Sequence, residues 1–136
     1  MEKDKKEMGE IFAQELVGNL NRNVRKEKMF NILEEYATQK KLINYKELYD
    51  SVGLNTENPD DRNTGSNILG EINHISIKNK DILLSAIVTL SKEQNPAVGF
   101  FNFAKEFRGF EKTNDEIEAM AFWAEEIKKV FKAYAE

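Results

Sequence analysis

His74 is the only histidine in the chain, so any histidine chemistry must use this residue. A Ser-His-Asp triad needs a serine and an acid that the fold holds beside the imidazole, and no serine here has the expected elbow or spacing. A metal site would have to combine His74 with carboxylates, because no second histidine lies at ligand spacing. We therefore interpret His74 as a helix-surface or boundary residue and predict no catalytic residue, no metal ligand and no cofactor.

Three pairs of adjacent acidic residues could in principle serve acid–base chemistry. Glu34–Glu35 and Glu125–Glu126 lie in predicted helices, where adjacent positions do not face one another. Asp60–Asp61 could bind a cation on a loop but lacks the EF-hand spacing. The glycines at 65 and 70 lack the Lys-Ser/Thr ending of a phosphate loop, so we interpret them as a turn before a helix and a close helix contact.

The composition limits the classes of protein to consider. The 136 residues include no cysteine, which excludes disulfides and thiol nucleophiles, and 40% of them are hydrophobic, which suits one domain with a core. The net charge of −4 disfavours general nucleic-acid binding, because phosphate neutralisation needs Lys and Arg. No apolar run approaches the ~18 residues of a membrane span. We expect a cytoplasmic protein that does not bind membranes.

Helical periodicity covers both ends of the chain. Two N-terminal helices are predicted, at about 4–20 and 24–40, and form a pair over 1–41. The last helix is predicted from a capping box at Thr113 and runs over about 114–135, within a C-terminal segment 113–136. Phe122 and Trp123 lie partly off its apolar stripe, so this helix could be contacted on more than one side. That stripe consists of Ile117, Met120, Ala121, Ala124, Ile127, Phe131 and Tyr134.

The unit 43–110 is expected to contain the other elements. A helix over 45–51 has a strong start at Asn44, with Glu47 at the capping-box position, and a left-handed end at Gly53. Residues 55–63 are predicted to be an exposed loop, followed by a helix from Thr64 or Ser66 to about Asn79.

The near-continuous apolar run 82–90 predicts a strand buried on both sides. Residues 99–103 are predicted to be a returning strand or the start of a short helix through Phe107. The fold class is therefore mostly α (α+β), with five or six helices, a small β-hairpin and a winged-helix-like centre in a single domain, 1–136.

The order helix, loop, helix, strand is that of a winged helix, which makes DNA binding through the helix 66–79 one hypothesis. Asn side chains can pair with adenine, and Ser and Thr can bind phosphate. The candidate contacts to duplex DNA are Arg62, Thr64, Ser66, Asn67, Asn73, Lys78 and Lys80.

The sequence resembles a family of small uncharacterised bacterial and phage proteins over about 43–134. The motifs are Tyr45-x-x-Leu48-x-x-x-Val52-Gly53-Leu54, Asn67-x-Leu69-Gly70-x-Ile72, Leu83 to Val88, Gly99-Phe100-Phe101, Phe122-Trp123-Ala124-Glu125 and Tyr134. This resemblance implies no particular activity. Over 45–90 the chain is also distantly similar to the winged-helix domain of alkyltransferase-like DNA-repair proteins. Their Pro-Cys-His-Arg motif is absent, so that likeness implies DNA binding without alkyl transfer.

Three functions remain open. The favoured one is a non-enzymatic protein-binding module, such as an inhibitor or regulatory accessory protein of bacterial or phage origin, because the negative charge opposes DNA binding. The DNA-binding protein and a small enzyme are the alternatives, and a homodimer with aromatic residues at its contact is compatible with each. The candidate residues for a protein interface are Glu34, Glu35, Phe122, Trp123, Glu125 and Glu126.

Overall fold

The computed structural model describes residues 21–90, 95–97 and 99–135, and the helix predicted at 4–20 lies outside this part of the chain. The prediction of a mostly α fold with a little β structure is confirmed. In chain order the elements are a helix over 21–38, β1 (Ile43–Asn44), α2 (Tyr45–Ser51), α3 (Pro59–Lys80), the 3₁₀ helix η1 (Leu84–Ile87), β2 (Val88–Thr89), α4 (Phe100–Arg108) and α5 (Glu116–Ala133).

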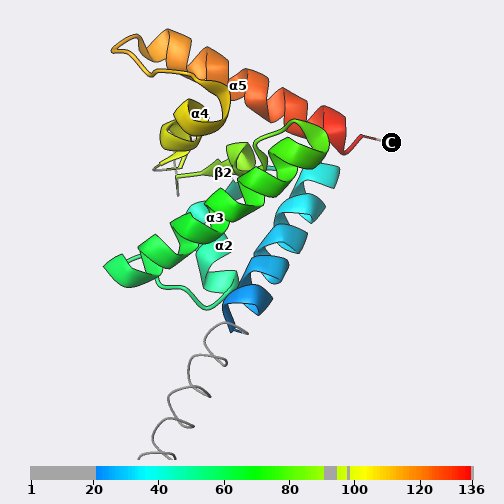
Figure 1. Ribbon diagram of the computed structural model, residues 1–136, viewed down its shortest axis with the longest axis vertical. Coiled ribbons are helices and arrows are strands. Elements are labelled where there is room, and N and C mark those ends of the chain that lie inside the picture. The colour runs from blue at the N-terminus through cyan, green and yellow to red at the C-terminus, as the bar shows by residue number, and fades with distance from the viewer. Residues whose placement is uncertain (1–20, 91–94, 98, 136) are drawn as a thin grey trace, which may run out of the picture.

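The helices surround a buried segment that contains η1 and β2. In Figure 1 the helix over 21–38 runs beside α3, while α4 and α5 cover the other side of the β2 region. Met29 and Leu33 from helix 21–38, Ile68 and Ile72 from α3, and Ile87 from η1 are all fully buried. One continuous core therefore joins all the described helices.

The apolar run 82–90 is not the strand that its composition predicts. Residues 84–87 form the 3₁₀ helix, and only Val88 and Thr89 are extended. β2 pairs in parallel with β1, with Ile43 opposite Val88, and a single antiparallel bridge joins Thr89 to Pro96. The predicted small β-hairpin is reduced to this bridge, with the Ala97 N–H donating to the Val88 carbonyl and the Leu90 N–H to the Asn95 carbonyl. The strand predicted over residues 82–87 is wrong, because side chains of α3 bind the backbone there instead of a partner strand.

α2 begins and ends as its local signals predict. Asn44 Oδ1 accepts a hydrogen bond from the Glu47 N–H at 2.8 Å, and Gly53 has a φ of +77°. The Leu54 N–H then donates to the Tyr49 carbonyl, which closes the helix as a Schellman turn. The capping box is only half formed, since the Glu47 carboxylate instead accepts the Tyr36 hydroxyl at 3.0 Å.

α3 begins earlier than predicted. Asn58 caps it by accepting hydrogen bonds from the N–H groups of Asp60 and Asp61, and Pro59 occupies its first position. This combination favours a helix start, so the predicted loop 55–63 is wrong from Pro59 onward. Gly65 consequently lies inside α3, not in a turn before it, and packs against the ring of Tyr49.

Of the two structures predicted after Gly99, a returning strand or a short helix, the helix is confirmed: it is α4, Phe100–Arg108. α5 also forms, but it is capped by Asp115, whose carboxylate accepts the N–H groups of Ile117 and Glu118. The predicted stripe is only partly confirmed. Met120, Ile127, Phe131 and Tyr134 are half-buried against the core, but the fully buried residues are Ala119, Trp123, Glu126 and Val130, and Ile117 is 84% exposed.

Gly65→Ala is expected to destabilise the fold by about 1–3 kcal/mol, because its Cβ would overlap a buried ring. That Cβ would lie 2.3 Å from Tyr49 Cζ, and Tyr49 is only 3% exposed. Gly70→Ala is the matched control in the same helix. Its nearest new contact, Phe103 Cε1, is at 3.4 Å, so higher helix propensity should leave stability unchanged or raise it by up to about 1 kcal/mol. Urea unfolding measures both, and equal effects would contradict the packing described here.

Candidate binding groove across α3

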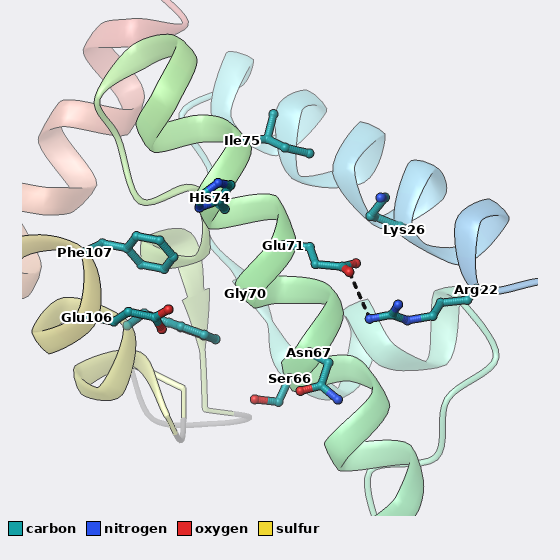
Figure 2. Close-up of a pocket in the computed structure, with 11 residues that line it drawn as sticks. Arg22, Lys26, Ser66, Asn67, Gly70, Glu71, His74, Ile75, Glu106 and Phe107 are labelled. Carbon is teal, nitrogen blue, oxygen red and sulfur yellow. Dashed lines mark ion pairs between the residues drawn. The ribbon is translucent and has the colours of Figure 1, made fainter. Parts of the chain in front are cut away.

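A surface hollow of about 590 Å³ lies along the outer side of α3. We call it the α3 groove. Figure 2 shows α3 between its two walls, helix 21–38 on one side and α4 on the other. Its lining residues are Arg22 and Lys26 from helix 21–38, Ser66, Asn67, Gly70, Glu71, His74 and Ile75 from α3, and Phe103, Glu106 and Phe107 from α4.

The centre of the groove is low because Ser66 and Gly70 on this face of α3 are small. Ser66, Gly70 and His74 are spaced four apart and therefore lie above one another on the helix. Gly70 has no side chain, which allows Phe103 to approach the helix closely. The two walls then rise on either side of a low centre.

The floor of the groove is partly apolar. Ile75, Phe103 and Phe107 are half-buried, and the His74 ring lies 6.2 Å from that of Phe107. A second hollow of about 490 Å³ shares Lys26 and Ile75 with the groove and adds the half-buried Phe30. Apolar side chains therefore lie on both sides of α3, with Phe103 and Phe107 toward α4 and Ile75 and Phe30 toward helix 21–38.

The edges of the α3 groove carry both positive and negative side chains. Arg22 Nη2 lies 3.1 Å from Glu71 Oε1, and both side chains are largely exposed, so the pair is weak and exchangeable (Figure 2). Lys26 and Glu106 form no ion pair with any residue that the structure describes. Lys26 lies on helix 21–38 and Glu106 on α4, so the two walls carry opposite charges.

The predicted DNA contacts do not form one surface. Only Ser66 and Asn67 line the groove. Arg62 lies at the start of α3, where its guanidinium donates to the Thr56 carbonyl, and the Thr64 hydroxyl donates to the Asp60 carbonyl.

The remaining predicted contacts lie toward the C-terminal end of α3. Lys78 is exposed, and Lys80 Nζ lies 4.6 Å from the centre of the Tyr134 ring. Asn73 is fully buried, so its prediction as a DNA contact is wrong for this conformation. Its amide donates to Ser85 Oγ at 2.8 Å and accepts from the Ser85 N–H at 3.1 Å, which fixes η1 to α3.

The predicted protein-interface residues separate by exposure. Glu35 and Glu125 are exposed, and half-buried Phe122 stacks on Phe110 at 4.0 Å. Glu34 accepts the Tyr134 hydroxyl at 2.8 Å, and burial, with help from Glu34, raises the pKa of Tyr134.

Trp123 and Glu126 are buried and therefore cannot form an exposed interface, contrary to their prediction. The Trp123 indole donates to the Ala86 carbonyl at 2.8 Å. Glu126 lies 3.2 Å from Arg108 Nε and 3.1 Å from Lys129 Nζ. Trp123 and Glu126 therefore hold α5 on the core and are not available to a partner protein.

The groove brings one histidine together with two acidic and two basic side chains. Among residues 21–90, 95–97 and 99–135 there is no group of three or more acidic, histidine or cysteine side chains that could hold a metal ion. Within the same residues, the ring of exposed His74 contacts Phe107 and no carboxylate orients it by a hydrogen bond. A general base is normally oriented by such a third group.

Comparisons with protein-family models, with curated proteins and with solved structures found no match. The resemblances to bacterial and phage proteins and to a winged-helix domain therefore stay predictions. Within the described part of the chain, no helix has both the length and the apolar character needed to cross a bilayer.

Asn73→Ala is expected to lower the free energy of unfolding by about 2–3 kcal/mol, because it leaves the buried Ser85 N–H and hydroxyl without partners. Asn67→Ala removes the same side chain from an exposed position of the same helix and should change stability by less than about 0.5 kcal/mol. Thermal and urea unfolding of the two variants test this difference. A small effect at Asn73 would mean that the buried network is not formed.

Proposed function

We propose that the protein is a non-enzymatic binding module whose α3 groove holds a segment of a partner protein. The observation that carries the proposal is an open, partly apolar groove between walls of opposite charge. Ile75 of α3 and Phe103 and Phe107 of α4 supply the apolar surface, Lys26 the charge of one wall and Glu106 that of the other. Partly buried aromatic side chains next to charged edges are characteristic of protein-binding surfaces.

The chemistry of the groove favours an amphipathic helix as the bound segment. Such helices place apolar side chains at positions i, i+3 or i+4, and i+7 into a hydrophobic groove. An acidic flank on the segment would face Arg22 and Lys26, and a basic flank would face Glu106. The Arg22–Glu71 pair can open to meet the partner at little cost, since exposed ion pairs contribute about 0–1 kcal/mol.

The charges along α3 weigh against the alternative of a DNA-binding helix. Asp60 and Asp61 occupy its first turn, where a phosphate would otherwise be favoured by the helix dipole. Glu71 lies midway between Arg62 at one end and Lys78 at the other, so the positive charges are separated by a negative one. DNA binding requires the neutralisation of several phosphates by nearby cations.

The cellular setting forms part of the same proposal. The cysteine-free composition suits a reducing compartment such as the cytoplasm. A regulatory or inhibitory role in a bacterium or phage rests on the sequence resemblance described above.

Lys26→Glu is expected to weaken partner binding about tenfold or more, because it reverses the charge of the basic wall. The ligands are helical peptides selected from a randomised library on the wild-type protein, and fluorescence anisotropy measures their affinity. Selected peptides should carry acidic residues beside apolar ones, although the protein itself is acidic.

Lys28→Glu is the matched control, because Lys28 lies on the same helix but lines a different hollow. It should leave peptide binding unchanged. Equal losses in the two variants would contradict binding at the groove. Salt-sensitive binding of duplex DNA that is weakened by Lys78→Glu, with no peptide selected, would support the DNA-binding alternative instead.

A further inference from the structure

One side of α3 has an acidic residue at its beginning and a basic residue at its end. Asp60 lies in the first turn of this helix and Lys78 in the last turn, and both side chains are exposed. They are eighteen positions apart, which is about five turns of 3.6 residues. The two residues therefore lie on the same side of α3, about 27 Å apart along its axis.

That side of α3 is the one on which the groove opens. Asn67 and His74 line the groove, and each lies within about 40° of Asp60 and Lys78 around the helix axis. Along the axis, Asp60 precedes the first groove residue of α3 by about 9 Å, and Lys78 follows the last one by about 5 Å. A segment bound along the groove therefore meets Asp60 at one end and Lys78 at the other.

Both end charges are accessible to a partner. Asp60 and Lys78 form no ion pair with any residue in the part of the chain that the structure describes. Glu71 lies between them on α3, but it is paired with Arg22. The charge that a bound segment meets therefore changes from negative to positive along α3.

Other charges near the groove do not cancel this polarity. Lys26 and Glu106 have opposite signs and line the groove itself, so they meet the sides of a bound helix and not its ends. Arg62 is close to Asp60 in the chain but lies about 160° from it around α3. There its guanidinium donates to the Thr56 carbonyl.

We propose that these two charges orient the partner helix, which binds antiparallel to α3 with an acidic first turn beside Lys78 and a basic last turn beside Asp60. This inference rests on the proposed function, since it concerns the segment that the α3 groove holds. A partner helix of about 18 residues spans the 27 Å or so between the two charges.

The helix dipoles favour the antiparallel orientation. A helix that is acidic in its first turn and basic in its last turn complements its own dipole. In the antiparallel orientation its positive N-terminal end lies beside the negative C-terminal end of α3, and its acidic first turn lies beside Lys78. In the parallel orientation the same helix would place its acidic turn beside Asp60 and its basic turn beside Lys78, so both ends would repel.

Two peptides of the same composition test the orientation on the full chain. Each consists of the central residues of a helical peptide selected from the randomised library, with charged residues added at both ends. The first peptide has two glutamates at its N-terminal end and two lysines at its C-terminal end, and the second has them exchanged. Fluorescence anisotropy should show that the first binds about fivefold more tightly, because only this peptide places opposite charges together at both ends.

Charge reversal on the protein separates orientation from peptide helicity, since the second peptide is also the less stable helix. Asp60→Lys/Lys78→Glu should lower the ratio of the two affinities about tenfold. Lys80→Glu is the matched control, because it makes the same change in the same turn but about 160° around α3 from Lys78, where Lys80 lies over the Tyr134 ring. It should change the ratio by less than about twofold, and circular dichroism checks that both variants fold.

Three results would overturn the proposal. One is a wild-type protein that prefers the second peptide. Another is a ratio that Asp60→Lys/Lys78→Glu leaves unchanged, and the third is an equal change of the ratio in Lys80→Glu. If Lys26→Glu still weakens the binding of both peptides in these cases, the proposed function stands and the orientation alone is wrong. Failure to select any peptide would overturn the proposed function and this inference with it.

Discussion

The buried backbone of residues 82–89 is the constraint on which the rest of the structure depends. All eight residues are buried, so their N–H and carbonyl groups need partners inside the protein. Ser76 Oγ donates to the Ile82 carbonyl at 2.7 Å, Asn73 binds Ser85 through both atoms of its amide, and Trp123 donates to the Ala86 carbonyl. Polar side chains of α3 and α5 therefore supply hydrogen-bond partners to this backbone, as neighbouring strands do in a sheet.

This constraint also positions the outer helices. Arg108 lies at the end of α4. Its Nη1 is 2.6 Å from Oδ1 of Asp81, the residue that ends α3, and its Nε is 3.2 Å from Oε1 of Glu126 in α5. Burial lowers the pKa of Arg108, but Asp81 and Glu126 outweigh that effect and the pKa is raised, so the guanidinium stays charged. Removal of either acid would leave a partly buried cation with fewer partners. The arginine thus holds α3, α4 and α5 together at the edge of the buried segment.

Sequence reasoning succeeded where structure is decided by neighbours in the chain. The helix 45–51 was predictable because Asn44 and Gly53 act within a few residues of it. The start of α3 was also signalled locally, by Asn58 and Pro59, but a run of turn-forming residues concealed it. The apolar run 82–90 was misread for another reason. Composition favours a strand there, and the partners that prevent one lie elsewhere in the chain, at Asn73, Ser76 and Trp123.

The α3 groove shows the same division between local and tertiary information. Ser66 and Asn67 were identified from the sequence, but the groove also needs Arg22 and Phe107, which only the folded chain brings to α3. The apolar stripe of α5 was visible in the sequence, but the residues of α5 that are fully buried depend on Trp123, whose indole donates to the Ala86 carbonyl.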